Sequence, residues 1–425
     1  MARETIYTAD TSSIKFGPGA TREVGTDMTR LGGRRVLVVT DPWMAQREPV
    51  SVVLEALRAA GCDVALFDRV RVEPTDVSFK EAIAVAVEGR FDGYVAVGGG
   101  SSMDTAKAAN LYATHPADFL AYVNQPIGQG KPVPGPLKPL IAVPTTAGTG
   151  SEATGVAIFD LVEMHAKTGI AHRALRPSLG IVDPDHTRSL PKMVAACSGF
   201  DVLSHAIESL TALPYQEREA SDSPLMRPSY QGANPLSDIW AARALELVSQ
   251  YIVRAAEDPS DDEARTQMLL AATMAGIGFG NAGVHLPHGM SYPVSGHVRD
   301  YRPDGYPGDQ PLVPHGMAVV LNAPAAFRFT APANPERHLY AARLMGVNVT
   351  DARFEEAGDI LAGAVIHLMR RTGIPNGLRA VGYTPEDVDN LVAGTLPQHR
   401  VTKLSPRPFS EEELVGIFLD AMRYW

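Results

Sequence analysis

Two of the 12 histidines, His288 and His315, share one local frame, Pro-His-Gly. Proline restricts the backbone before each imidazole and glycine removes the side chain after it, so the frame favours a ring held in a fixed position. Upstream, Asp201 and His205 are four residues apart in a helical pattern, which puts them on one face of a helix. These four residues offer three nitrogens and one oxygen, a set that binds a divalent transition metal and leaves a position open.

This metal hypothesis has alternatives. An Asp-x-x-x-His pair alone is more often an ion pair on a helix surface. His285, three residues before His288, is a rival ligand; the shared frame favours His288 and leaves His285 as a residue of the pocket. Glu208, three residues after His205 on the same side of the helix, is placed to orient a metal ligand.

A glycine-rich turn separates a strand pattern from a helix pattern in GYVAVGGGSSMDTAKAANLYA. Gly99 and Gly100 let backbone N–H groups approach a ligand, and Ser101 or Ser102 is predicted to cap the helix, whose first N–H groups favour a phosphate. A plain tight turn is the alternative, because neither G-x-G-x-x-G nor G-K-[ST] is matched here. The segment 278–283 does match G-x-G-x-x-G, but it follows a helix and is expected to serve helix packing.

A second polar loop, VPTTAGTGSEAT, follows a later strand pattern and contributes Thr145, Thr146 and Thr149. Open α/β sheets bind ligands at the carboxyl ends of their strands, so two such loops predict a nucleotide. Asp41, at the end of an earlier strand pattern, is placed to accept hydrogen bonds from a ribose diol. Its charge would repel a 2′-phosphate, which favours NAD over NADP; a helix cap before Pro42 is the alternative.

The elements that must position these residues change in character near Pro184. Before it, short apolar runs alternate with helical patterns, which predicts a doubly wound α/β domain with a parallel sheet. After it, long segments of helical period predict an all-helical domain. The expected domains are residues 1–186, which bind the dinucleotide, and 187–425, which bind metal and substrate. The predicted strands are 36–41, 63–68, 93–99, 139–146 and 179–184.

The composition limits the classes of function. The formal net charge is −10 without a long run of Lys or Arg, so neither nucleic acid nor a membrane surface is an expected partner. No apolar window reaches the length of a membrane-spanning helix. Cys62 and Cys197 form no C-x-x-C pair, and the first residues show no signal or transit pattern, which together predict a cytoplasmic protein.

The motifs GGGSSMDTAK, PTTAGTGSE, GFDVLSHAIES and HGMSYP with the second PHG resemble, in this order, those of the iron-containing (group III) alcohol dehydrogenases. The resemblance implies a dinucleotide-binding α/β domain joined to a helical domain, in the dehydroquinate synthase-like architecture. It implies the cofactors NAD and Fe²⁺, with Zn²⁺ as an alternative metal. It implies metal ligands at Asp201, His205, His288 and His315. It implies NAD contacts at Asp41, Gly99, Gly100, Ser101, Ser102, Thr145, Thr146, Thr149 and Lys167.

A closer resemblance covers nearly the whole chain and is to the hydroxyacid-oxoacid transhydrogenase branch, in segments such as RVEPTD, SYQGANPLSDIWA and GTLPQHRVTKLSP. That branch converts 4-hydroxybutyrate and 2-oxoglutarate into succinic semialdehyde and 2-hydroxyglutarate. The resemblance implies a metal-dependent oxidoreductase that transfers hydride from a hydroxyacid to an oxoacid through NAD. Its eukaryotic members carry a mitochondrial presequence; the chain as given begins without one, so the expected location stays cytoplasmic.

The substrate side of the site has its own expected residues. Many simple alcohol dehydrogenases of the family have histidine four residues after the third ligand, where this chain has Tyr292. His285 or Tyr292 is expected to relay the substrate proton. Arg400 and Lys403 are candidates for binding substrate carboxylates, with a solvated surface charge as the alternative for each.

Two other functions remain open on the sequence alone. One is a conventional NAD-dependent iron-containing alcohol dehydrogenase that acts on small primary alcohols or aldehydes. The other is a non-enzymatic protein that binds nucleotide and metal, although all four candidate metal ligands are present. A small-molecule substrate is the expected partner, and the chain is expected to form a homo-oligomer.

Overall fold

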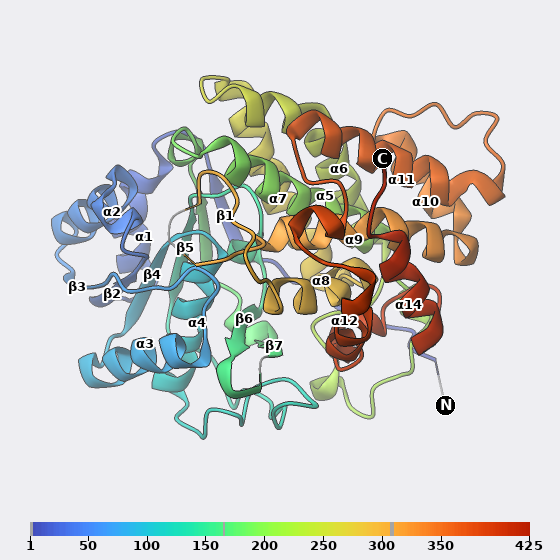
Figure 1. The fold of residues 1–425 in the computed structure, drawn as a ribbon. Helices are drawn as coiled ribbons and strands as arrows, with labels where there is room; N and C mark the ends of the chain where they lie inside the picture. Colours follow the sequence, from blue (N-terminus) through green and yellow to red (C-terminus); the bar gives the residue numbers. More distant parts are fainter. Residues whose placement is uncertain (1–2, 165, 307–309) are drawn as a thin grey trace. The chain divides into compact units, whose positions relative to one another are not determined.

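The computed structural model describes residues 3–164, 166–306 and 310–425, and the chain forms two compact units (Figure 1). One unit is Asp10–Arg188, and the other joins the residues up to Ala9 with Ser189–Trp425. The predicted boundary lies two residues before this one, and the prediction assigns the N-terminal residues to the α/β domain instead.

Hydrogen bonds explain why the N-terminal residues belong to the helical unit. The backbone N–H of Glu4 donates to the carbonyl of Arg218 at 2.9 Å. The backbone N–H of Thr8 donates to Oε1 of Gln231, also at 2.9 Å, and the Nε2 of Gln231 donates back to the carbonyl of Thr8 at 2.8 Å. The segment is therefore fastened to a loop more than 200 residues away in sequence.

Among the described residues of the α/β unit, six parallel strands form one sheet in the order β1-β8-β5-β4-β2-β3. They are β1 (Ser13–Phe16), β2 (Arg35–Val39), β3 (Asp63–Phe67), β4 (Gly93–Gly98), β5 (Leu140–Pro144) and β8 (Leu179–Val182). The last five confirm the predicted strands. Two features were not predicted: β1, whose four residues SIKF carry no apolar run, and the antiparallel hairpin of β6 (Val156–Leu161) and β7 (Ala166–Ala171).

The sheet is covered by helices on both faces, and β2 shows how its sequence specifies this. Val36 and Val38 pack with the helices of one face, while Leu37 and Val39 pack with those of the other. Because side chains alternate along a strand, a strand buried on both faces reads as a continuous apolar run. Figure 1 shows the two layers, α1 (Val24–Arg30) with α2 (Glu48–Ala59), and α3 (Asp76–Gly89) with α4 (Gly100–Thr114).

The second unit is built from helices, as predicted. Its described helices are α5 (Lys192–Thr211), α6 (Pro235–Glu257), α7 (Asp262–Ala282), α8 (Leu286–Gly296), α9 (His315–Thr330), α10 (Pro335–Leu344), α11 (Ala357–Thr372), α12 (Val388–Thr395), α13 (His399–Thr402) and α14 (Glu411–Asp420). Local signals set several ends: Asn234 caps α6 by accepting from the N–H of Ser237 at 3.0 Å, and α11 stops at Gly373, which has a φ of +81°.

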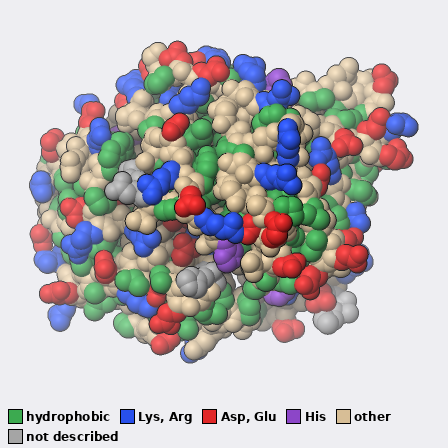
Figure 2. Space-filling model, in the orientation of Figure 1, with side chains coloured by type: hydrophobic (Ala, Val, Ile, Leu, Met, Phe, Trp, Pro, Cys, Tyr) green, Lys and Arg blue, Asp and Glu red, His purple; other side chains and the backbone are tan. Residues whose placement is uncertain are grey.

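Over the part of the chain that the structure describes, no single helix has the length and apolar composition to cross a membrane. The pair α7 and α8, bent by 106°, passes that test only as a pair. On the face drawn in Figure 2, Lys and Arg side chains are interspersed with Asp and Glu. The expected lack of a nucleic-acid or membrane partner stays a prediction.

Candidate functional site

Four helix positions in the second unit bring the candidate metal ligands together. Asp201 and His205 lie on the buried face of α5, and the two Pro-His-Gly frames begin α8 and α9, which places His288 and His315 in the first turns of those helices. Asp201 Oδ1 lies 3.7 Å from Nε2 of His205 and 3.6 Å from Nε2 of His288 and of His315. One carboxylate oxygen therefore faces three imidazole nitrogens.

Two atoms of this cluster have the chemistry and surroundings of cation ligands. Asp201 Oδ1 and His288 Nε2 are buried and have no hydrogen-bond partner. Buried polar atoms in native proteins are almost always paired, so an oxygen and a nitrogen that face each other unpaired need a further partner. Ligand atoms about 2.0–2.2 Å from a divalent metal lie roughly 3–3.6 Å from one another, close to the separations seen. The residues fit a divalent cation, and such ligands accept iron or zinc.

His205 is the least close of the four. The ligand atoms of Asp201, His288 and His315 all lie within 4.8 Å of one another, and His205 is not in that set. Its ring is held by stacking, since the ring of Phe279 lies parallel to it with centroids 3.8 Å apart. Phe279 belongs to the segment 278–283 that matches G-x-G-x-x-G, and this segment lies within and just after α7, where it packs helices as expected.

Glycine in each Pro-His-Gly frame allows a close approach of backbones. A Cβ on Gly316 would lie 2.0 Å from the carbonyl oxygen of Cys197 in α5, so α9 can pack at this distance only without a side chain there. A Cβ on Gly289 would lie 2.6 Å from Cγ2 of Thr402 in α13. The frame therefore combines a helix start, an imidazole and a tight helix contact, which explains why it occurs twice.

Glu208 orients one of the imidazoles. Its side chain is fully buried, and Oε1 accepts from the backbone N–H groups of His285 at 2.8 Å and of His288 at 3.3 Å. Its Oε2 is hydrogen bonded to Nδ1 of His288. With Nδ1 occupied, Nε2 is the atom turned toward Asp201, which is how a carboxylate fixes a metal-binding histidine.

The charges of the cluster follow from burial and proximity. Burial lowers the pKa of His205 to about 3, so this ring is neutral at pH 7, the form that binds a metal. Burial alone would raise the pKa of Asp201, but the neighbouring His205, His315 and His288 hold it below its usual range. Burial alone would lower the pKa of His288, but Glu208 and Asp201 raise it to about 10. A metal that binds His288 therefore replaces a proton.

His285, the rival ligand, points elsewhere. It is fully buried, its Nε2 lies 2.9 Å from Oγ1 of Thr211, and its Nδ1 has no hydrogen-bond partner. Burial lowers its pKa to about 4. Among the described residues, the cluster around Asp201 does not include it.

Tyr292 and Arg400 form a second polar group beside the candidate ligands. Tyr292 lies one helical turn after His288 in α8, and its hydroxyl accepts a hydrogen bond from Nη2 of Arg400 at 2.7 Å. The guanidinium lies over the ring of Tyr230, 5.0 Å from its centroid. Burial alone would lower the pKa of Arg400, but Tyr292 and Tyr230 raise it by more, so its net pKa is above the usual value and the guanidinium stays charged. Lys403, the other predicted cation, is exposed.

The α/β unit brings the predicted nucleotide residues to one edge of its sheet. In the strand order, β2 and β4 are neighbours at the point where the order reverses, and ligands bind beyond the carboxyl ends of strands at such points. Gly98 ends β4 with a φ of +148°, which favours glycine. A Cβ at Gly98 would lie 2.4 Å from Oγ of Ser102 and 3.7 Å from Oδ2 of Asp41, so the turns after both strands meet there.

The threonine loop after β5 touches the same turn. A Cβ on Gly99 would lie 3.3 Å from Oγ1 of Thr146, and a Cβ on Gly100 would lie 2.7 Å from Cγ2 of Thr149. The backbone N–H of Thr145 donates to the carbonyl of Gly98 at 3.0 Å. The structure thus brings together the loops that follow β2, β4 and β5. The glycine turn after β4 has no space for side chains at Gly98 and Gly100.

Two details of this region differ from the prediction. No serine caps α4: its N-cap is Gly99 and has no side-chain hydrogen bond, so the predicted serine cap is wrong. Ser101 is engaged elsewhere, because its Oγ accepts from the N–H of Glu73 at 3.3 Å. The first N–H groups of α4 are left without a capping side chain, which favours an anionic ligand. Asp41 is not the N-cap of the next helix, the 3₁₀ helix Met44–Gln46, whose N-cap is Trp43, but its Oδ1 accepts from the N–H groups of Trp43 and Met44 at 3.0 and 2.9 Å.

Lys167 in β7 is held by carboxylates. Its Nζ lies 2.7 Å from Oε2 of Glu73 and 3.0 Å from Oδ1 of Asp160, and its side chain is buried. Burial alone would lower the pKa of Lys167, but these two carboxylates raise it above its usual range. Because Glu73 also contacts Ser101, Lys167 is linked to the glycine turn through one intermediate residue.

Sequence reasoning missed Asp104 and Lys107, which hold the threonine loop in place. Lys107 is fully buried in α4 and donates to Oγ of Ser151 and to the carbonyl of Val156 at 2.9 Å. Asp104 Oδ2 accepts from the N–H of Ile158 at 2.9 Å. The signal was an Asp and a Lys three residues apart in an otherwise small and apolar helix, a spacing that puts both on one buried face.

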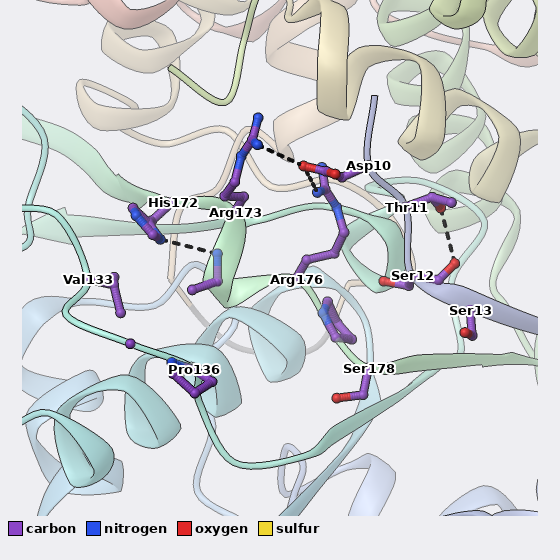
Figure 3. Close-up of a pocket in the computed structure, with 13 residues that line it drawn as sticks. Asp10, Thr11, Ser12, Ser13, Val133, Pro136, His172, Arg173, Arg176 and Ser178 are labelled. Atoms are coloured by element: carbon purple, nitrogen blue, oxygen red, sulfur yellow. Dashed lines mark hydrogen bonds and ion pairs between the residues drawn. The ribbon is translucent and has the colours of Figure 1, made fainter. Parts of the chain in front are cut away.

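A surface pocket on the α/β unit is lined by none of the predicted site residues. Asp10, Ser12, His172, Arg173 and Arg176 are among the residues around it (Figure 3). The cations of this pocket already have a partner, since Nη1 of Arg173 and of Arg176 lie 3.4 and 3.5 Å from Oδ2 of Asp10. This pocket therefore gives no reason to place the candidate functional site elsewhere than at the predicted residues.

Comparison with known families gives two matches that together cover most of the chain. Residues 11–184 match the family described as iron-containing alcohol dehydrogenase. Residues 229–422 match the family described as Fe-containing alcohol dehydrogenase, C-terminal.

Similar proteins share both sequence and fold. A protein of Xenopus tropicalis named hydroxyacid-oxoacid transhydrogenase, mitochondrial, is 56% identical over 100% of this chain and 92% of its own length. The human protein of that name is 54% identical over 97% of this chain and 89% of its own length. Among solved structures, a 1,3-propanediol oxidoreductase has a TM-score of 0.86 and 30% identity, covering 98% of this chain and 100% of that one.

A solved complex with NAD⁺ is also similar. Sulfoacetaldehyde reductase from Bifidobacterium kashiwanohense has a TM-score of 0.80 and 26% identity, covering 99% of both chains. The names of the transhydrogenase relatives correct one expectation. They include the word mitochondrial, which contradicts the predicted cytoplasmic location. Cysteine usage and the first residues of the chain were not sufficient evidence for a compartment.

Proposed function

Because the chain belongs to the iron-containing alcohol dehydrogenase family, we propose that it is a hydroxyacid-oxoacid transhydrogenase that works through NAD and a divalent metal. The first substrate is a hydroxyacid of the 4-hydroxybutyrate type, and the second is an oxoacid of the 2-oxoglutarate type. The hydroxyacid gives a hydride from its carbinol carbon to NAD⁺ and a proton from its hydroxyl. The oxoacid takes up a hydride from NADH and a proton, so the oxoacid is the oxidant and NAD⁺ is regenerated.

The observation that carries this proposal is the carboxylate oxygen of Asp201 facing three imidazole nitrogens at 3.6–3.7 Å. Asp201, His205, His288 and His315 are the residues that would hold the metal, Fe²⁺ by family and Zn²⁺ as the alternative. A bound divalent metal acts as a Lewis acid that polarises the substrate oxygen and lowers the pKa of the hydroxyl.

The surrounding residues position these groups and handle the proton. Glu208 fixes the ring of His288, and the backbone N–H of His285 fixes Glu208. We assign His285 to this supporting role, because its ring nitrogens contact Thr211 or nothing among the described residues. Tyr292 is the proposed proton relay: its hydroxyl oxygen accepts from Arg400, so its own proton is available for transfer.

In the α/β unit, the proposed NAD contacts are those named from the resemblance. The uncapped start of α4 at Gly99 and Gly100 suits the pyrophosphate, and the threonine loop lies against it. Asp41 keeps Oδ2 toward the glycine turn while Oδ1 accepts from the N–H of Trp43, so it remains a candidate for the ribose. Ser101 and Lys167 are engaged with Glu73, so we propose that they shape the turn.

The test is turnover of 4-hydroxybutyrate plus 2-oxoglutarate by anaerobically purified, iron-loaded protein without added nicotinamide. Formation of 2-hydroxyglutarate is the expected result and requires that NAD stays bound between the two half-reactions. The matched control is the His315→Ala variant, which should form no product. If product forms only when NAD is supplied, or neutral primary alcohols are oxidised better, the chain is a conventional dehydrogenase instead.

A further inference from the structure

The guanidinium of Arg400, a half-buried residue, has no carboxylate partner among the described residues. Its Nη2 donates to the hydroxyl of Tyr292, but its Nη1 is buried and has no hydrogen-bond partner. No carboxylate of the described residues forms an ion pair with it. A charged group taken out of water without a counter-charge is costly, so such a group is a candidate for pairing with a ligand.

Two buried lysines of this chain do have carboxylate partners. Lys107 lies 3.6 Å from Asp104, and Lys167 lies 2.7 Å from Glu73. These pairs are complete without a ligand. Arg400 differs in that it is contacted by tyrosine hydroxyls and a ring face, which orient the guanidinium without neutralising it.

Packing places Arg400 next to the candidate metal ligands. Its partner Tyr292 is four residues after His288 on the same helix, a rise of about 6 Å. Gly289, directly after His288, is the point at which α8 contacts the α13 segment that carries Arg400. On the other side, the ring of Tyr230 lies 6.3 Å from that of Phe279, which stacks on His205. The guanidinium and the metal ligands are therefore connected through both α7 and α8.

The two hydroxyacids of the proposed reaction, one consumed and one formed, share a feature that a single cation can recognise. In 4-hydroxybutyrate, two methylene groups separate the carbinol carbon from the carboxylate. In 2-hydroxyglutarate, two methylene groups likewise separate the carbinol carbon from the distal carboxylate. A cation at one fixed place relative to the reacting carbon would therefore fit both compounds, although one is a primary and the other a secondary alcohol.

We propose that Arg400 binds this common carboxylate, through Nη1, and so sets the substrate class to acids with two methylenes between the reacting carbon and the carboxylate. The inference rests on the proposed function and deepens it. Tyr292 is the positioning residue for Arg400, and the planar guanidinium suits a carboxylate with two parallel hydrogen bonds.

The main test compares Arg400→Gln with Lys403→Gln, which removes an exposed cation three residues away. For each protein, kcat/KM is measured for 4-hydroxybutyrate and for the neutral 1,4-butanediol. In Arg400→Gln the ratio of acid to diol should fall about 100-fold, because a charge-assisted pair is lost only with the acid. Lys403→Gln should leave the ratio near that of the wild type. An equal ratio in all three proteins would overturn the proposal.

Binding of glutarate, an unreactive five-carbon dicarboxylate, gives a readout that does not depend on turnover. Thermal stabilisation by glutarate should be seen with the wild type and Lys403→Gln and be lost in Arg400→Gln. Equal stabilisation of all three would refute the anion site even if the enzyme proves to be a transhydrogenase. Conversely, a wild type that binds glutarate through Arg400 but forms no 2-hydroxyglutarate would remove the proposed function and keep the site.

Two measurements remain decisive if Arg400→Gln does not fold. In the wild type, hydroxyacids with one, two or three methylenes between carbinol and carboxylate should differ in kcat/KM, with the two-methylene acid highest. Tyr292→Phe keeps the charge of Arg400 but removes the hydroxyl that orients its guanidinium. This variant should raise KM for the acid by about 10-fold relative to the diol. The absence of both the length preference and the KM shift would contradict the proposal.

Discussion

Replacing Gly316 with alanine would test whether close packing of α9 on α5 holds the metal ligands in register. The added Cβ would lie 2.0 Å from the carbonyl oxygen of Cys197, whereas real Cβ atoms almost never come closer than 3.0 Å. The obstacle is backbone, so α9 has to move by about 1 Å. His315, the preceding residue, would move with it relative to Asp201.

The size of the effect follows from the two consequences of that movement. Overpacking of a close helix contact costs about 1–3 kcal/mol of unfolding free energy. Metal–ligand distances tolerate only about 0.2 Å, so displacement of His315 should weaken metal binding by at least the roughly 10–100-fold typical of losing a supporting partner. The assays are chemical unfolding of the metal-free protein and titration of Fe²⁺ or Zn²⁺ under anaerobic conditions.

Gly363→Ala is the matched control. Gly363 is an exposed residue inside α11, and a Cβ there would meet nothing within 4 Å, so the substitution should stabilise the protein by about 0.5–1 kcal/mol and leave metal affinity unchanged. If Gly316→Ala bound metal as tightly as this control, the argument that glycine in the Pro-His-Gly frame serves the metal ligands would be refuted.

Three further predictions concern two residues of the same cluster and one buried histidine elsewhere in the helical unit. His288→Ala should abolish turnover while NAD binding, measured by titration, stays within about 3-fold of the wild type; full activity would sink the metal assignment. Glu208→Gln should weaken metal binding about 10–100-fold with the fold retained, whereas unchanged affinity would contradict its orienting role. Burial lowers the pKa of His338 in the folded protein to about 4, below its usual 6.5. Between these two pH values the imidazole is protonated in the unfolded chain and neutral in the folded protein. Its share of stability, about 3 kcal/mol, should be lost as pH falls from 6.5 to 4, and urea unfolding of His338→Gln should show a shallower loss over that range than the wild type.

The convergence of the four candidate metal ligands could be predicted because each lies in a local frame that fixes the nearby backbone. The i, i+4 spacing of Asp201 and His205 determines their common face, and each Pro-His-Gly begins a helix. The five strands β2, β3, β4, β5 and β8 could also be predicted from the sequence, because strands buried on both faces are continuous apolar runs. In contrast, β1 is short and half-exposed, and its pairing with β8 connects residues far apart in the chain.

What the sequence did not reveal depends on contacts between distant segments. Arg400 and Lys403 look alike in one polar stretch, but Arg400 meets Tyr292, 108 residues away, while Lys403 remains exposed. The lack of a serine cap on α4 has the same origin, because Ser101 is drawn to Glu73 by the path of another loop. Such pairings are set by tertiary packing and leave no local pattern.

The fastening of the N-terminal residues to the helical unit has a consequence for biosynthesis. Glu4 and Thr8 leave the ribosome before the α/β unit, yet their partners at Arg218, Arg227 and Gln231 are made more than 200 residues later. At about 5–20 residues per second this delay is roughly 10–45 s, long enough for the intervening α/β unit to fold by itself. Glu4 and Thr8 are therefore synthesised before the α/β unit and meet their hydrogen-bond partners only after it, because the α/β unit is inserted within the sequence of the helical unit.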